Sequence, residues 1–104
     1  MMTDTGTVDR IAKLFQAIGE VNRLRIVEVL WDGPRNVTEI SKQLGIKIVN
    51  VSHHLSVLKD AGLVQNEKCG RFVLYTLHPE YHRPASENSS ALLDLGWCKV
   101  TPTK

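Results

Sequence analysis

The chain has 104 residues, of which 42% are hydrophobic and 23% are charged, and its formal net charge is +2. This length fits one domain and leaves no room for a second. A domain this small buries a modest fraction of its surface, so a partner subunit would help to stabilise it. No apolar run approaches the ~20 residues that a membrane-spanning helix needs, which argues against a membrane partner.

The positive charge is concentrated in the middle third of the chain. Between residues 36 and 71 there are five cations and three anions, a local excess that equals the net charge of the whole sequence. This distribution favours an anionic partner for that part. The two cysteines, Cys69 and Cys98, match no zinc-binding spacing. Free thiols without a signal peptide suggest a reducing compartment, so we expect a cytoplasmic protein.

Apolar residues recur at helical spacing from Val8 to Ile18 and predict a first helix. Asp4 or Thr7 is the expected cap at its start, and Gly19 ends it. The apolar stripe is broad for so small a domain, and it fits either the core or a subunit interface. The residues that we expect at a dimer interface are Val8, Ile11, Phe15 and Ile18.

A second helix is predicted from Asn22, taken as its N-cap, through Asp32. Apolar residues cover most of its circumference and leave only a narrow polar strip, which is typical of a central helix. Gly33 and Pro34 then end it, because a left-handed residue followed by proline does not continue a helix.

The next segment predicts a helix-turn-helix unit over about residues 36–62. Asn36 and Glu39 have the spacing of a capping box at the start of a short helix, which Gly45 ends. A longer helix follows from about residue 48 to residue 61. A short helix, a glycine-containing turn and a longer helix are together the signature of this motif.

The longer helix has two different faces. Val51, Leu55 and Leu58 point one way, and the opposite face is small, polar and nearly uncharged. Hydroxyl, amide and imidazole groups donate or accept hydrogen bonds, which suits the edges of DNA bases. A helix face that is merely solvated more often carries Glu/Lys pairs. The candidate DNA-binding residues in this region are Lys47, Val49, Asn50, Ser52, His53, Ser56 and Lys59.

Two β-rich runs, Leu63–Val64 and Phe72–Leu77, follow the longer helix and predict a hairpin. Residues 66–71 between them are expected to form its charged, glycine-bearing tip. A hairpin directly after a DNA-reading helix is a wing, here over about residues 63–77. Lys68 and Arg71 are the candidate DNA-binding residues of the wing, because they can reach phosphates.

The expected fold is therefore mainly α with a small β-hairpin (α+β), a winged helix-turn-helix. We expect residues 8–78 to form the DNA-binding domain. Residues 79–104 are expected to be a linker and a C-terminal tail, a candidate for docking on the body or on a dimer partner.

Three stretches resemble the ArsR/SmtB family of bacterial winged-helix repressors, over roughly residues 11–77. Residues 20–26 resemble the opening of the family's second helix, and residues 51–64 are similar to its recognition helix and exit. Residues 70–75 resemble the second strand of its wing. The resemblance implies a homodimer that binds double-stranded DNA at an inverted repeat in a promoter and releases it when an effector arrives.

The chain departs from the metal-binding patterns of that family. Metal-sensing members often carry Cys-x-Cys at the start of the third helix, where this chain has Asn36 and Thr38. The other family pattern, Asp-x-His with His-x-x-Glu on a final helix, is missing too, so the effector is unknown and no cofactor is expected. Weak metal candidates are His78, Glu80 and His82, which an extended segment could present on one side.

The working hypothesis is a sequence-specific DNA-binding regulator, a homodimeric repressor of an inverted-repeat operator. One alternative is a winged-helix module whose polar helix face contacts protein. Another is a metal- or redox-responsive regulator that uses a non-standard site, with Cys69 as the redox candidate. The flanking cations favour DNA, because a protein-binding face would not need them. Nothing arranges a nucleophile, a base and oxyanion donors, so we expect no enzyme.

Overall fold

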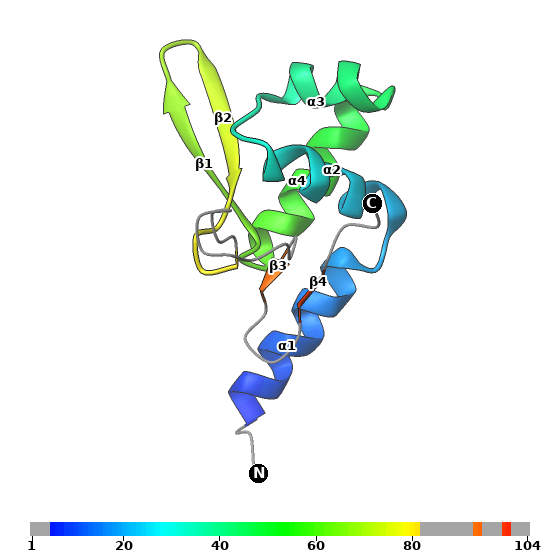
Figure 1. The fold of residues 1–104 in the computed structure, drawn as a ribbon, viewed down its shortest axis with the longest axis vertical. Helices are drawn as coiled ribbons and strands as arrows, with labels where there is room; N and C mark the ends of the chain where they lie inside the picture. The colour runs from blue at the N-terminus through cyan, green and yellow to red at the C-terminus, as the bar shows by residue number, and fades with distance from the viewer. Residues whose placement is uncertain (1–4, 82–92, 95–98, 101–104) are drawn as a thin grey trace.

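A computed structural model describes residues 5–81, 93–94 and 99–100 of the chain (Figure 1). Its elements are α1 (Thr5–Ile18), α2 (Val21–Trp31), α3 (Val37–Leu44), α4 (Ile48–Asp60), β1 (Val64–Cys69), β2 (Phe72–Leu77), β3 (Leu93–Asp94) and β4 (Lys99–Val100). Strand β1 pairs with β2 and β3 pairs with β4, both antiparallel. The expected class, mainly α with a small β-hairpin, is confirmed.

The start of α2 differs from the sequence prediction. Glu20 is the N-cap, with extended backbone angles (φ −133°, ψ 133°), and its carboxylate accepts the N–H groups of Asn22 and Arg23. Asn22 lies inside the helix, so the prediction that it is the cap was wrong. The physical reason is that the side chain of Glu20 is long enough for its carboxylate to accept two of the N–H groups that a helix start leaves without partners.

The predicted capping box at the start of α3 is confirmed. The side chain of Asn36 accepts the N–H of Glu39 at 2.8 Å, and the carboxylate of Glu39 accepts the N–H of Asn36 at 2.9 Å. Gly45 ends the helix with a left-handed backbone (φ 68°), as expected. The hydroxyl of Ser41 then donates to the carbonyl of Ile46 and closes the turn before α4.

The hydrophobic core lies between the four helices and the base of the hairpin. Each buried aliphatic side chain contributes about 1.5–3 kcal/mol, so this cluster is the main source of stability. No polar or charged residue is buried in the described part of the chain. The core side chains are Leu14, Ala17, Ile18, Ile26, Val27, Val29, Leu30, Ile40, Val51, Leu55, Leu58, Leu63, Val64, Leu77 and Tyr81.

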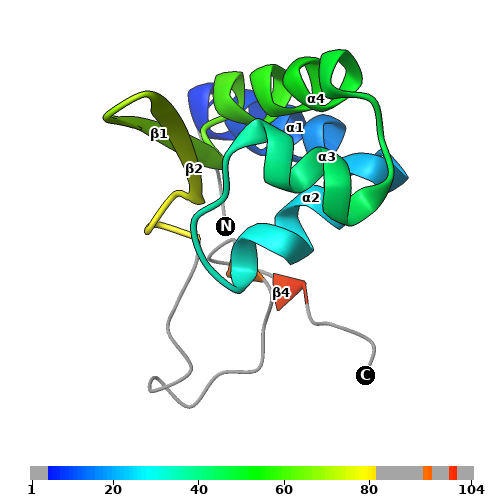
Figure 2. The ribbon, with the colours of Figure 1, turned by 90° about the horizontal axis from the view of Figure 1, so that it is seen from above.

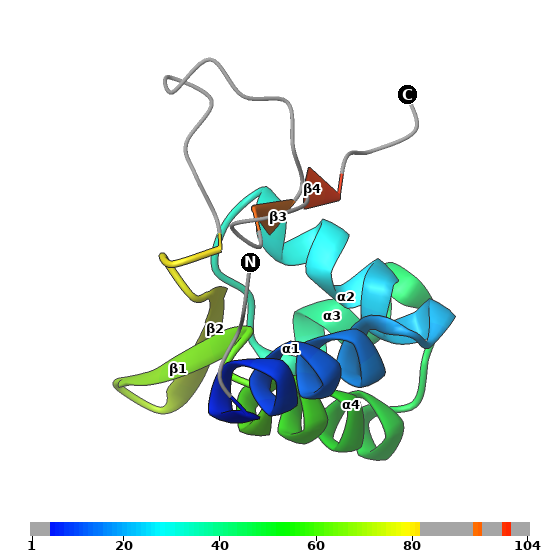
Figure 3. The same cartoon turned by 90° about the horizontal axis from the view of Figure 1, so that it is seen from below.

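The helices are arranged so that α4 lies at an outer edge of the molecule. Viewed from above and from below, α1 and α4 lie side by side, with α2 and α3 on the inner side of α4 (Figures 2 and 3). The hairpin of β1 and β2 projects at one end of this helical layer. No helix in the described part is long and apolar enough to cross a membrane.

The hairpin is longer and its turn tighter than the sequence suggests. Residues 66–69 belong to β1, and Cys69 pairs with Phe72 across a connection of only Gly70 and Arg71. The predicted tip over residues 66–71 was therefore too long. Gly70 has a left-handed backbone (φ 63°), which the favoured two-residue hairpin turns require at this position.

The loop between α2 and α3 adds a third extended segment beside β2. The N–H of Tyr75 donates to the carbonyl of Arg35 at 2.8 Å, and the N–H of Arg35 donates to the carbonyl of Tyr75 at 3.2 Å. This pair ties the base of the hairpin to the start of the helix-turn-helix unit, so the orientation of the wing is fixed relative to α3.

The packed body continues through Tyr81, three residues beyond the boundary at residue 78 that the sequence suggests. Tyr81 is 4% exposed, and its hydroxyl accepts a hydrogen bond from the guanidinium of Arg10, which also pairs with Glu80. The hydrogen bond to Glu80, followed by that to Tyr81, raises the pKa of Arg10. These contacts hold the segment after β2 against α1. In the tail that the sequence suggests as a docking segment, β3 and β4 pair with each other, and its residues 82–92, 95–98 and 101–104 lie outside the described residues.

Candidate nucleic-acid interface

Helix α4 separates its residues into a buried and an open face, as the sequence predicts. Val51, Leu55 and Leu58 are fully buried, whereas Val49 on the opposite face is 71% exposed. Every side chain proposed to meet DNA from this helix region is exposed, namely Lys47, Val49, Asn50, Ser52, His53, Ser56 and Lys59. Lys47 occupies the N-cap position of α4 and makes no side-chain capping bond, because an ammonium group has no acceptor for the N–H groups of the first turn.

The two cations predicted in the wing, Lys68 and Arg71, are both exposed. Arg71 is the second residue of the two-residue turn and therefore lies at the apex of the hairpin. The hairpin extends away from the helices, with its turn at the same end of the molecule as α3 (Figure 1). Two separate elements, an exposed polar helix face and a basic hairpin tip, thus project from one rigid core.

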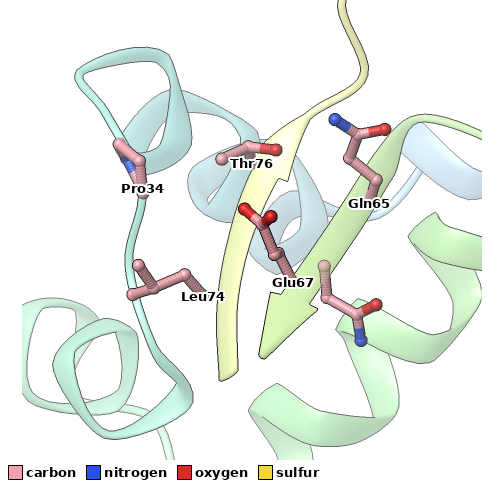
Figure 4. A pocket seen from close by; sticks show the side chains of 6 residues that line it. Pro34, Gln65, Glu67, Leu74 and Thr76 are labelled. Atoms are coloured by element: carbon pink, nitrogen blue, oxygen red, sulfur yellow. The ribbon is translucent and has the colours of Figure 1, made fainter. Parts of the chain in front are cut away.

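One face of the hairpin carries a shallow pocket of about 330 Å³ (Figure 4). Its lining residues are Pro34, Gln65, Asn66, Glu67, Leu74 and Thr76. The carboxylate of Glu67 lies over this face of the hairpin and lines the pocket (Figure 4). A carboxylate repels phosphate groups, so this face of the hairpin is a less favourable surface for an anion than the basic tip.

Helix α1 has one face in the core and another face open. Leu14 and Ile18 are buried, whereas Val8 is 51% and Phe15 is 44% exposed, and Ile11 between them is half-buried. Ile18, predicted at the dimer interface, is only 7% exposed and packs in the core of its own chain. It stands one helical turn after Leu14, on the side of α1 that faces the core. The open apolar face therefore consists of the other three interface candidates.

The start of α2 meets α4 in a small polar junction. Burial raises the pKa of the Glu20 carboxyl, but the N–H groups of Arg23 and Asn22, with the charge of His54, outweigh that effect, and the pKa is lowered overall. Arg23 Nε and His54 Nδ1 are buried without hydrogen-bond partners, and no other side-chain nitrogen or oxygen of the described residues is in that state. His54 therefore packs toward α2, away from the open face of α4.

The weak metal candidates are committed to other contacts or lie outside the described residues. His78 Nδ1 accepts the N–H of Glu80 at 3.1 Å, and the carboxylate of Glu80 pairs with Arg10. His82 lies outside the described residues. Within residues 5–81, 93–94 and 99–100, no three His, Cys, Asp or Glu side chains are placed to hold a metal ion.

Neither the cysteines nor the two positions compared with the Cys-x-Cys pattern are gathered into a metal site in the described part of the chain. Cys69 is an exposed free thiol at the end of β1, and Cys98 lies outside the described residues. Asn36 stands where metal-sensing members of the resembled family carry a cysteine, and its side chain caps α3. Thr38 is exposed on the same helix.

The sequence patterns did not predict two contacts of the domain, the backbone pair between Arg35 and Tyr75 and the packing of Tyr81. The pair between Arg35 and Tyr75 joins residues far apart in the chain, and the only nearby sign of non-helical backbone was Pro34, whose ring fixes its own φ and ends a helix. Tyr81 is the first large ring after the wing, and its position within a polar stretch was a signal that the body extends further.

The described part of the chain has four helices, two of which form a helix-turn-helix with an open polar face, and a two-stranded wing. These features define a winged helix-turn-helix protein. The family model described as "Bacterial regulatory protein, arsR family" matches residues 20–66. The transcriptional repressor SdpR of Bacillus subtilis is 31% identical over 65 residues, which cover 62% of this chain and 72% of SdpR. The chain belongs to the ArsR family.

Further comparisons agree with this assignment. The regulator NmtR of Mycobacterium tuberculosis is 35% identical over 75 residues, 72% of this chain but only 62% of NmtR. Reduced HlyU from Vibrio cholerae superimposes with a TM-score of 0.65 at 32% identity, covering 70% of this chain and 77% of HlyU. The homodimeric winged helix-turn-helix domain of Mb0332 from Mycobacterium bovis gives a TM-score of 0.70 at 28% identity. The match covers 74% of this chain and 73% of the Mb0332 chain.

Proposed function

We propose that this chain is a sequence-specific double-stranded-DNA-binding transcriptional regulator, a homodimeric repressor of an inverted-repeat operator. The observation that carries the proposal is the open face of α4, polar and almost uncharged, beside a hairpin with a basic tip. In winged helix-turn-helix proteins such a helix enters the major groove. As a gene regulator it would act in the cytoplasm, and the regulatory names of its relatives support a role without catalysis.

Within this proposal the side chains have distinct roles. Asn50, His53 and two serines, Ser52 and Ser56, donate or accept hydrogen bonds at base edges, and Val49 contacts a thymine methyl group. Lys47, Lys59, Lys68 and Arg71 bind phosphates, which fixes the register of the protein on the duplex.

The proposed dimer uses the open face of α1, formed by Val8, Ile11 and Phe15. Exposed apolar side chains gathered on one helix face are typical of a subunit interface. A two-fold dimer presents two copies of α4, and two reading helices match two half-sites of an inverted repeat. The homodimeric state of the Mb0332 domain supports this arrangement.

Titration of the chain with genomic DNA fragments at several salt concentrations tests the proposal. We expect a selected fragment to bind with a steep salt dependence, because phosphate contacts release counterions. Arg71→Met should weaken binding to all sequences alike and reduce the salt slope by about one unit. Arg25→Met, at an exposed position of α2, is the matched control. Absence of binding to any fragment would favour the protein-interaction module.

A further inference from the structure

A second pocket lies where α1, α2 and the end of α4 meet, and it has a volume of about 310 Å³. Its lining residues are Lys13, Gln16, Ala17, Arg23, Val57, Asp60 and Ala61. The alanines and the valine are buried or half-buried and form an apolar floor, while the polar side chains form the rim. An apolar surface with a few convergent polar groups is the usual composition of a small-molecule site.

The rim of this pocket favours an anion. Lys13 and Arg23 supply two positive charges, and Asp60 supplies one negative charge. Of these lining residues, Arg23 has a buried Nε without a hydrogen-bond partner. A buried donor without a partner is costly, and a carboxylate can engage a guanidinium through two parallel hydrogen bonds.

We propose that this pocket binds a small organic carboxylate. The carboxylate would bind Arg23 and Lys13, and the apolar part of the molecule would rest on Ala17, Val57 and Ala61. An inorganic anion such as phosphate would leave this floor uncovered. The pocket volume is at the lower limit of typical ligand sites, which fits an acid of roughly ten heavy atoms.

The pocket stays open in the proposed dimer. On α1, Lys13 lies about 140° around the helix from Val8, at ~100° per residue, so partner contact through Val8 and Phe15 does not fill it. The pocket also includes Asp60, the last residue of α4. A bound acid thus connects the proposed dimer helix to the proposed DNA-reading helix, which makes it an effector. This regulatory step rests on the proposed function, whereas ligand binding itself does not.

Benzoate and hexanoate, titrated into the full chain without DNA and followed by amide NMR shifts, test the site. We expect saturable shifts at Ala17, Val57 and Ala61 with both acids. The neutral amides of the same shape, benzamide and hexanamide, should give none, and inorganic phosphate should bind more weakly. No saturable shift with either acid, shifts located elsewhere, or equal binding of the amides or of phosphate would overturn the proposal.

Variants then test the residues. Arg23→Met should weaken benzoate binding about tenfold and Lys13→Met about threefold, whereas Asp60→Asn should strengthen it. Arg25→Met, two residues away on α2, should bind as the wild type does. Lys13 is exposed, so its variant should fold even if the Arg23 variant does not. Unchanged affinity in Lys13→Met, or in a folded Arg23→Met, would refute the site.

A last measurement tests regulation separately. Benzoate at saturation should change the affinity of the wild type for its selected DNA fragment about fivefold or more, a typical allosteric coupling. Lys13→Met should show a weaker effect at the same concentration. Benzoate binding at the pocket without any change in DNA affinity would refute the effector role and leave the binding site intact. Failure to bind DNA at all would refute the proposed function and not the pocket.

Discussion

Glu20 connects the start of α2 to α4, the proposed DNA-reading helix. One oxygen of its carboxylate accepts two backbone N–H groups, those of Asn22 and Arg23. His54 of α4 lies close enough for its charge to help lower the pKa of this carboxyl. The cap therefore stabilises α2 and at the same time faces the one half-buried histidine of the described part of α4.

Glu20→Gln should reduce the pH dependence of stability in acid. The pKa of Glu20 is lower in the folded chain, so its carboxylate stabilises the fold above the unfolded pKa. That stabilisation is lost as the pH falls through the folded pKa. Thermal unfolding between pH 7 and pH 3 should show a smaller loss of Tm for the variant than for the wild type. Equal losses would show that Glu20 is not linked to folding.

Contacts between residues close together in the chain could be predicted from the sequence, and contacts between distant residues could not. The capping box of Asn36 and Glu39 depends only on residue types three positions apart, so it was predictable. Glu20 was missed because asparagine is by type the better N-cap, whereas here the longer side chain of Glu20 reaches two backbone N–H groups of the first turn. The Tyr81 hydroxyl bonds to Arg10, 71 residues away, which no local pattern indicates.

At the level of elements, the wing is a rigid and strongly paired hairpin. Its six residue pairs extend from Val64 and Leu77 at the buried base to Cys69 and Phe72 at the turn. Arg35 adds backbone hydrogen bonds on the other side of β2. A wing held in this way can place Arg71 at a fixed distance from α4.

Gly70→Ala should weaken the wing through its backbone alone. A Cβ at this position would meet no atom within 4 Å, so space is not the obstacle. The left-handed φ of 63° costs an alanine about 1–2 kcal/mol. Amide exchange of the hairpin should speed up, and DNA affinity should fall for all sequences alike. Gly70→Asn is the control, because asparagine tolerates this conformation. Alanine and asparagine variants with equal exchange would contradict this account.

The faces of α4 could be assigned from the sequence because burial follows the period of the helix. Val51, Leu55 and Leu58 occupy one side, and the structure buries all three. The length of β1 was underestimated because residues 65–68 are all polar and show no alternation. They form a strand through backbone pairing with β2, for which the side chains give little signal.

At the scale of the whole molecule, the proposed homodimer forms through the open face of α1. Ile11→Glu and Phe15→Glu should each raise the dimer dissociation constant about a hundredfold, because an interface would bury an unpaired charge. Gln43→Glu, exposed on α3, adds the same charge outside this face. Sedimentation of the three variants, with circular dichroism as the folding check, is the measurement. Dimers of wild-type stability in both α1 variants would place the interface elsewhere.

The central claim, that the open face of α4 reads DNA sequence, is tested most directly by operator selection. The wild type and His53→Ala are each used to select binding sites from a random duplex library, with Gln43→Ala as a control away from this face. The account predicts that His53→Ala loses its preference at one position of each half-site, at a cost of about 1–3 kcal/mol on the best site, while the control keeps the wild-type preference. An unchanged preference in a folded His53→Ala, repeated for Asn50→Ala, would contradict it.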